Sequence, residues 1–179
     1  MRGSSPVGLD ELRGLVRDVP DHPQAGVVFK DITPLLGDAD AFRFAINALA
    51  EPFAREAVSH VVGIEARGFI VAAPVAHQLG AGFVPVRKAG KLPWHTVSQQ
   101  YSLEYGTDTL ELHVDGVGGG DRVLIIDDVL ATGGTAHATA AMVAGTGATV
   151  VGLGFLIELE FLGGRSRLVD HKIASLLRY

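Results

Sequence analysis

Apolar and polar residues follow one another along most of the chain in a pattern that predicts strands and helices in turn. Short apolar runs bounded by turn residues predict strands at 60–65, 82–87, 122–127 and 149–157. An amphipathic stripe predicts a helix at 39–57, and the segments 69–79, 135–144 and 161–169 between and after the strands are also predicted as helices. This alternation predicts an α/β fold in which helices cover both faces of a parallel sheet.

The two ends of the chain carry weaker patterns. Residues 9–19 have helical spacing and predict a helix, whereas residues 18–26 hold two prolines and are expected to be irregular. Pro52 is expected to kink or end the helix predicted at 39–57. Residues 175–179 predict a short final strand.

A long excursion interrupts the alternation between residues 89 and 114. Within it, residues 101–104 and 109–113 indicate an antiparallel hairpin around Gly106. Long excursions in compact domains usually have a functional role, so this segment is a candidate for one.

Composition narrows the class of protein. A chain of 179 residues suits one domain with a sizeable core, and the sequence holds no repeat or linker. The net charge of −5 and the lack of a basic run argue against a nucleic-acid partner. The absence of cysteine excludes disulfides and thiolate catalysis. Without a signal-like N-terminus or an apolar stretch of ~18 residues, we expect a soluble, cytoplasmic protein with no membrane contact.

The strongest candidate for chemistry is the segment 123–135. Four apolar residues lead into the adjacent carboxylates Asp127 and Asp128, at the end of a predicted strand where open α/β sheets bind ligands. Glycines in the next loop let backbone N–H groups surround an anion, and the N-terminus of the following helix adds positive charge. An isolated Asp-Asp pair would be read as a solvated turn, but this context predicts a phosphate site beside two acids. The loop residues are Ala131, Thr132, Gly133, Gly134 and Thr135.

This segment resembles the 5-phosphoribosyl-1-pyrophosphate (PRPP) motif of type I phosphoribosyltransferases. The resemblance implies that Asp127 and Asp128 face the ribose 2′- and 3′-hydroxyls and that residues 131–135 hold the 5′-phosphate. It also implies the type I phosphoribosyltransferase fold, a parallel sheet flanked by helices, as a single domain over residues 1–179. In that fold a small N-terminal hood covers about 1–36, the core about 37–179, and a mobile hairpin lid about 89–114.

A second motif follows the first core strand. Glu65, Ala66 and Arg67 precede a predicted helix, where a guanidinium and exposed backbone amides suit a pyrophosphate. The resemblance makes this the pyrophosphate loop, with Arg67 both catalytic and substrate-binding and the peptide before Ala66 often cis. The alternative is a surface arginine at a helix start.

Three cations, Arg87, Lys88 and Lys91, lie at the end of the next strand. Their position predicts an anion clamp, although most basic clusters are solvated loop charges. In the family, the arginine that matches Arg87 commonly reaches the pyrophosphate across a dimer interface.

The excursion contains Tyr101-Ser-Leu-Glu-Tyr-Gly106, which is similar to the catalytic lid of family members that use adenine. A lid would exclude water from an oxocarbenium-like state at ribose C1. The resemblance implies that Glu104 manages a proton on the purine ring and that Tyr105 covers the leaving group. On the pattern alone, both would be ordinary hairpin residues.

Residues 25–36 predict a short strand and a turn, and they match the hood of the adenine-using members. There, backbone groups at Val28 and Lys30 pair with the base and Phe29 stacks on it, although many members have Arg at the Lys30 position. The resemblance therefore implies PRPP and adenine as substrates, AMP and pyrophosphate as products, a homodimer, and Mg²⁺ held mainly by substrate and water with no direct protein ligand. The alternatives are an enzyme for another purine and a non-catalytic PRPP sensor that regulates transcription.

Other motif interpretations fail. The chain has no Gly-Lys-Ser/Thr phosphate loop, Ile157 breaks the dinucleotide fingerprint begun at Gly152, and the histidines lack zinc spacing.

Overall fold

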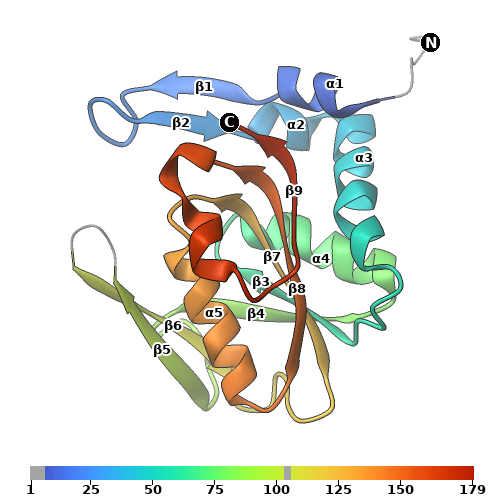
Figure 1. Ribbon diagram of the computed structural model, residues 1–179, viewed down its shortest axis with the longest axis vertical. Coiled ribbons are helices and arrows are strands. Elements are labelled where there is room, and N and C mark those ends of the chain that lie inside the picture. Colours follow the sequence, from blue (N-terminus) through green and yellow to red (C-terminus); the bar gives the residue numbers. More distant parts are fainter. Residues whose placement is uncertain (1–6, 103–105) are drawn as a thin grey trace. The chain divides into compact units, whose positions relative to one another are not determined.

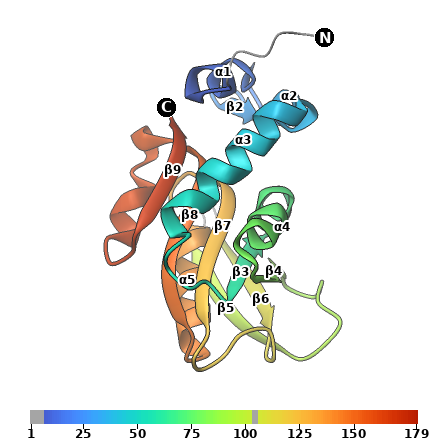
Figure 2. The same cartoon turned by 90° about the vertical axis from the view of Figure 1, so that its right-hand side faces the viewer.

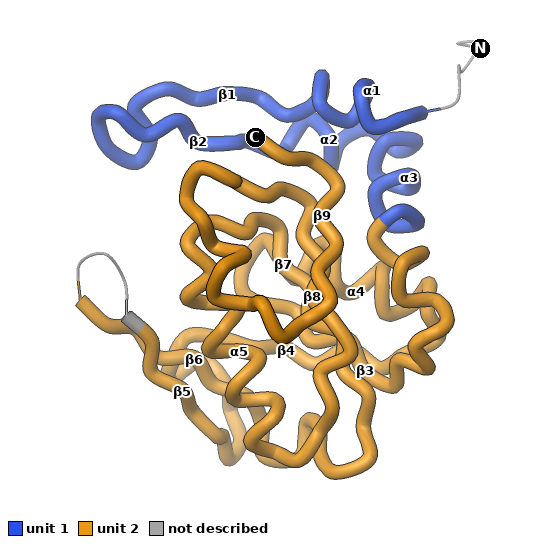
Figure 3. Tube along the Cα trace, in the orientation of Figure 1, with its two compact units in different colours: residues 1–48 blue, residues 49–179 orange. Residues whose placement is uncertain are grey.

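A computed structural model describes residues 7–102 and 106–179 of the chain. They belong to two compact units, residues 1–48 and 49–179 (Figure 3). The units are described separately below.

Unit 1 is built around a two-stranded antiparallel sheet in which Val19 pairs with Phe29. Its elements are α1 (Leu9–Gly14), β1 (Arg17–Pro20), β2 (Val28–Asp31), α2 (Thr33–Gly37) and most of α3 (Ala39–Ala50). The helix predicted at 9–19 is wrong beyond Gly14, because residues 17–20 pair with β2 and this pairing overrides local helical spacing. The irregular segment predicted at 18–26 is correspondingly shorter, since β1 extends to Pro20 and only the connection to β2 is irregular.

Unit 2 contains a seven-stranded sheet with the order β5-β6-β4-β3-β7-β8-β9 (Figure 1). Its strands are β3 (His60–Ile64), β4 (Gly82–Lys88), β5 (Thr96–Ser102), β6 (Thr107–His113), β7 (Arg122–Leu130), β8 (Thr149–Glu158) and β9 (Ile173–Arg178). Its helices are η1 (Glu51–Phe53), α4 (Gly68–Leu79), α5 (Gly134–Gly145), η2 (Glu160–Leu162) and η3 (Gly164–Leu168). The strands from β4 to β9 in this order are parallel, as predicted, and the β5-β6 hairpin adds an antiparallel edge to them.

Helices cover the two faces of this sheet, with α4 on one side and α5 on the other (Figure 2). Side chains alternate along the strands, so Val62 and Ile125 join Val143 of α5 in one buried cluster. Gly63 faces α4, where a Cβ atom would lie 2.8 Å from the Cβ of Ala72. Glycine at position 63 thus allows α4 to pack closely against β3.

Glycine and proline end the helices earlier than the apolar spacing suggests. The predicted break at Pro52 is confirmed, since α3 ends at Ala50 and η1 follows. The single helix predicted at 161–169 is wrong: Gly163, at φ +65°, separates the 3₁₀ turns η2 and η3. In the described part of the chain, the helices are too short or too polar to cross a membrane.

Candidate functional site

Two adjoining cavities lie at the carboxyl ends of β3, β4 and β7, and they share Asp127 and Thr135. The larger, about 350 Å³, is lined by Ile64, Glu65, Ala66, Arg67, Lys88, Tyr101, Leu110, Asp127, Asp128 and Thr135. The smaller, about 70 Å³, is lined by Asp127 and residues 129–136. The strand ends therefore bring together acids, cations and a glycine loop.

The smaller cavity is formed by the loop between β7 and α5. Gly133 has φ +78°, a conformation that disfavours any residue with a Cβ atom, and it caps the N-terminus of α5. The first N–H groups of a helix have no partner within the helix, and they carry partial positive charge. The loop and helix start can therefore bind a phosphate group through backbone amides, as the sequence predicts.

Beside this loop lie the two acids, of which Asp128 is buried and Asp127 is partly buried. Asp128 is 6% exposed, and its Oδ2 lies 2.7 Å from Nε of Arg67. The Oδ1 atom of Asp127 accepts a hydrogen bond of 2.9 Å from the N–H of Asp128. Burial and the neighbouring Asp128 carboxylate raise the pKa of Asp127 well above its ordinary range. Burial also raises the pKa of Asp128, against the opposing charge of Arg67.

We expect Asp127→Asn to stabilise the fold at neutral pH, although Asp127 lines the site. The raised folded-state pKa means that the folded protein holds this proton more tightly than the unfolded chain does. The carboxyl therefore lowers stability as the pH rises past its ordinary value of 3.8. Asparagine removes the charge, so the free energy of unfolding at pH 7 should rise by about 1 kcal/mol, and Tm by about 2–4 °C.

Thermal denaturation of both proteins at pH 7 and pH 4 checks this expectation. The gain in Tm should shrink at pH 4, where the native carboxyl takes up its proton. As a control, Asp115→Asn at an exposed position should leave Tm unchanged at both pH values. A variant that is less stable than the native protein at pH 7 would contradict the interpretation.

The start of α4 closes the larger cavity. The Glu65–Ala66 peptide is cis, which agrees with the family feature inferred for this position. Gly68 follows Arg67, and a Cβ atom there would lie 2.6 Å from Oδ1 of Asp127. Glycine therefore allows the helix start, and with it Arg67, to lie directly against the acid pair.

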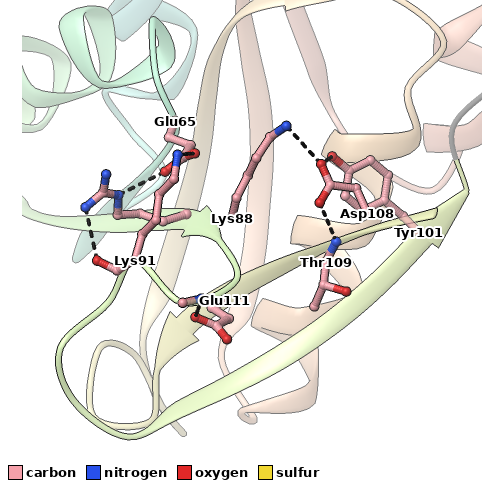
Figure 4. A network of polar contacts seen from close by, with 9 residues as sticks. Glu65, Lys88, Lys91, Tyr101, Asp108, Thr109 and Glu111 are labelled. Carbon is pink, nitrogen blue, oxygen red and sulfur yellow. Dashed lines mark hydrogen bonds and ion pairs between the residues drawn. The ribbon is translucent and has the colours of Figure 1, made fainter. Parts of the chain in front are cut away.

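Of the three predicted cations, Lys88 alone lines the larger cavity. Its Nζ lies 3.0 Å from Oδ2 of Asp108, and Figure 4 shows Tyr101 beside the same carboxylate. The hydrogen bond to Asp108 raises the pKa of Lys88, so the ammonium is charged at neutral pH. Burial raises the pKa of Tyr101, against a side-chain hydrogen bond with Thr135. The hairpin strands therefore meet both the lysine and the phosphate loop.

The other two cations, Arg87 and Lys91, both pair with Glu65. Nε of Arg87 donates to Glu65 at 2.9 Å, and Nζ of Lys91 lies 2.5 Å from the other oxygen of the same carboxylate. Figure 4 shows Lys91 against this carboxylate. Burial raises the pKa of Glu65, but the hydrogen bonds from Lys91 and Arg87 outweigh it and lower the pKa overall. The carboxylate therefore stays ionised and pairs with both cations at the cavity wall, although Arg87 and Lys91 do not themselves line the cavity.

The remaining predicted residues belong to other segments of the chain. Val28, Phe29 and Lys30 belong to β2 of unit 1, where Lys30 pairs with Asp18 at 2.6 Å. Glu104 and Tyr105 lie outside the described residues. The core of the predicted site therefore consists of the segments at 65–67, 88 and 127–135.

Sequence reasoning missed Asp108 and Leu110 as neighbours of the site and did not assign a role to Tyr101. The strand alternation around the hairpin turn could have placed Asp108 opposite Tyr101, since these two residues pair in the β5-β6 register. The contact of Asp108 with Lys88 depends on the pairing of β6 with β4, which local patterns do not encode.

Comparison with known proteins gives a consistent result. The model of the phosphoribosyl transferase domain family matches residues 36–175. An adenine phosphoribosyltransferase of Thermobifida fusca is 60% identical over 161 residues, which cover 90% of this chain and 92% of the relative. One of Acidothermus cellulolyticus is 59% identical over 163 residues, covering 91% and 92%.

Solved structures resemble the chain over similar spans. The adenine phosphoribosyltransferase of Rhodothermus marinus has a TM-score of 0.92 at 54% identity, covering 96% of this chain and 98% of that one. The Saccharomyces cerevisiae enzyme, crystallised with adenine and an imino-altritol bisphosphate, has a TM-score of 0.89 at 37% identity, covering 94% and 97%.

Proposed function

Because the chain belongs to the adenine phosphoribosyltransferase family, we propose that it transfers the 5-phosphoribosyl group of PRPP to adenine and releases pyrophosphate, forming AMP. It has the type I phosphoribosyltransferase fold of this family. The reaction places the protein in purine salvage.

The observation that carries the proposal is the pair of cavities joined at Asp127 and Thr135. PRPP has two anionic ends separated by a ribose, and the site offers an amide-lined loop, an acid pair and a cationic wall in that order. The 5′-phosphate binds the loop at 131–135, and the ribose hydroxyls donate to Asp127 and Asp128. The pyrophosphate lies toward Arg67 and Lys88.

Catalysis in this arrangement comes from position and charge. The bond from ribose C1 to the pyrophosphate oxygen breaks as adenine approaches, and negative charge develops on the departing group. Arg67 and Lys88 are cations already held by Asp128 and Asp108, so little reorganisation is needed to stabilise that charge. By the resemblance to the family, Arg87 reaches the pyrophosphate of a neighbouring copy of the chain, and Lys91 stays a predicted contact of the anionic substrate.

Mg²⁺ fits the chemistry of this site. Carboxylate oxygens and phosphate groups are its preferred surroundings, and the acid pair supplies such oxygens at the cavity wall. Within the described residues, no cluster of three or more His, Asp or Glu forms a complete metal site. Asp127 and Asp128 would therefore meet the ion through substrate and water, and the ion would neutralise charge on the pyrophosphate.

The base is selected by the segment at 28–30. The backbone at Val28 and Lys30 reads the edge of adenine and Phe29 stacks on its ring, so hypoxanthine or guanine would leave a polar edge unpaired. Glu104 of the lid manages the proton on the base, and Tyr105 covers the leaving group. These roles rest on the match of both segments to the adenine-using members of the family.

A homodimer completes the proposal. Ile70 and Phe83 are large apolar residues that are 45% and 38% exposed on α4 and β4, the elements that also carry Arg67 and Arg87 at their ends. Burial of such a surface against a second copy would explain its apolar character. A cytoplasmic location stays a prediction of the sequence.

AMP formation tests the reaction. The full chain is incubated with PRPP and Mg²⁺ and offered adenine, hypoxanthine, guanine or xanthine separately. We expect turnover with adenine, and kcat/KM for the other bases lower by about 10²-fold or more. Turnover with another base would overturn the assignment of residues 28–30, and PRPP binding without turnover on any base would favour a PRPP sensor.

A further inference from the structure

The phosphate loop rests against a second segment of unit 2, the start of η3, with backbone directly against backbone. A Cβ atom at Gly164 would lie 2.1 Å from the carbonyl oxygen of Ala131 and 2.8 Å from the backbone nitrogen of Gly133. A Cβ atom at Gly133 would in turn lie 2.4 Å from the carbonyl oxygen of Gly164. No side chain cushions this contact, so a displacement of Gly164 moves the amides of the loop.

The residue after Gly164 is fixed by an ion pair. Arg165 donates from Nε to Oε1 of Glu158 at 2.8 Å and from Nη2 to Oε2 at 2.6 Å. The side chain of Glu158 is 4% exposed, and Arg178 lies 3.7 Å from its Oε2. A two-pronged contact with a buried carboxylate fixes both the distance and the orientation of the guanidinium.

The Glu158 carboxylate lies on the strand that pairs with the residues just before the loop. Glu158 ends β8 and pairs in register with Leu130, which directly precedes the loop, and the N–H of Leu159 donates to the carbonyl of Leu130 at 2.9 Å. The hydrogen bond from Arg165 lowers the pKa of Glu158 although burial opposes it, so the carboxylate is ionised at neutral pH. The ion pair therefore connects the end of β8, which pairs with the residue before the loop, to the start of η3, which contacts the loop through Gly164.

We propose that Glu158 and Arg165 are positioning residues, which hold the amides of loop 131–135 in place through Gly164. The inference rests on the proposed function, because it takes the loop as the site of the 5′-phosphate. Neither residue lines the two cavities, so they act on the substrate only through the loop. Their loss weakens the grip on the 5′-phosphate and leaves the pyrophosphate and adenine contacts unchanged.

Inhibition by fragments of the substrate tests the proposal on the full chain. With Glu158→Gln, we expect the inhibition constant of ribose 5-phosphate and the KM for PRPP to rise about tenfold, while the inhibition constant of pyrophosphate and the KM for adenine stay within about twofold. Arg165→Lys keeps the cation but breaks the two-pronged contact, so it should give a smaller rise in the same two constants. Should Glu158→Gln fail to fold, the lysine variant decides the question.

Glu56→Gln is the matched control. Glu56 also holds two cations in unit 2, Lys172 at 2.7 Å and Arg122 at 3.5 Å, and its loss should leave ribose 5-phosphate inhibition unchanged. An equal weakening of pyrophosphate and ribose 5-phosphate, or no change for ribose 5-phosphate, would overturn the positioning role alone. If ribose 5-phosphate did not inhibit even the native protein, the assignment of the loop would fail, and the positioning role with it.

Discussion

Asp128→Asn is expected to lower kcat/KM for PRPP by about 10²-fold to 10³-fold, comparable with the loss of one preorganised electrostatic contact in other active sites. Asp128 is 6% exposed and has two roles at once, as an acceptor for a ribose hydroxyl and as the partner of Arg67 at 2.7 Å. Asparagine keeps the size of the side chain but removes the charge that holds the guanidinium. Steady-state rates of AMP formation at varied PRPP measure the effect.

Asp170→Asn is the control, since Asp170 is exposed and far along the chain from the acid pair. Circular dichroism of both variants separates a loss of activity from a loss of fold. An Asp128→Asn protein that is folded and retains the native kcat/KM would show that this carboxylate does not contact the substrate.

Gly133→Ala is expected to abolish measurable binding of ribose 5-phosphate and to reduce kcat/KM for PRPP by about 10²-fold or more, because a displacement of about 1 Å in a positioning group is enough for such a loss. The φ of +78° costs a residue with a Cβ atom roughly 1–2 kcal/mol. The Cβ atom would also lie 2.4 Å from the carbonyl oxygen of Gly164, so the loop or η3 must move.

The variant Gly120→Ala separates the cost of the positive φ from the effect of the clash with Gly164. Gly120 has φ +93° and no atom within 4 Å of a Cβ position, so alanine there is strained in its backbone but does not clash with a neighbour. It should lose stability and keep its affinity for ribose 5-phosphate. Equal affinities in the native and Gly133→Ala proteins would contradict the account of the loop.

Much of the fold could be read from the sequence because short apolar runs bounded by turn residues mark the core strands. The centres of the runs at 60–65 and 122–127 are continuously apolar, as is typical of strands buried on both faces, and both strands were predicted at their observed starts. Failures occurred where pairing or glycine decided the structure. Residues 17–20 became a strand by pairing with β2, and Gly163 divided the predicted helix at 161–169.

The candidate site was likewise predictable from the sequence only in part. Asp127, Asp128 and the glycine loop were predictable, because strand, acids and loop are contiguous in the sequence. The Asp108–Lys88 contact and the support of the loop by Glu158 and Arg165 were not, since each joins residues from separate elements. The sequence also predicted Arg87 and Lys91 as part of one clamp with Lys88, whereas these two cations pair with the Glu65 carboxylate and do not line the cavity. That buried acid was assigned to the substrate, and local patterns did not indicate that it pairs with cations from β4.

A crystal structure of the full chain with AMP and pyrophosphate is the most direct test of the account. We expect this structure to show the 5′-phosphate on the amides of residues 131–135, the ribose hydroxyls on Asp127 and Asp128, and the pyrophosphate beside Arg67 and Lys88. A 5′-phosphate bound away from the glycine loop, with the acid pair free of ribose contacts, would contradict it.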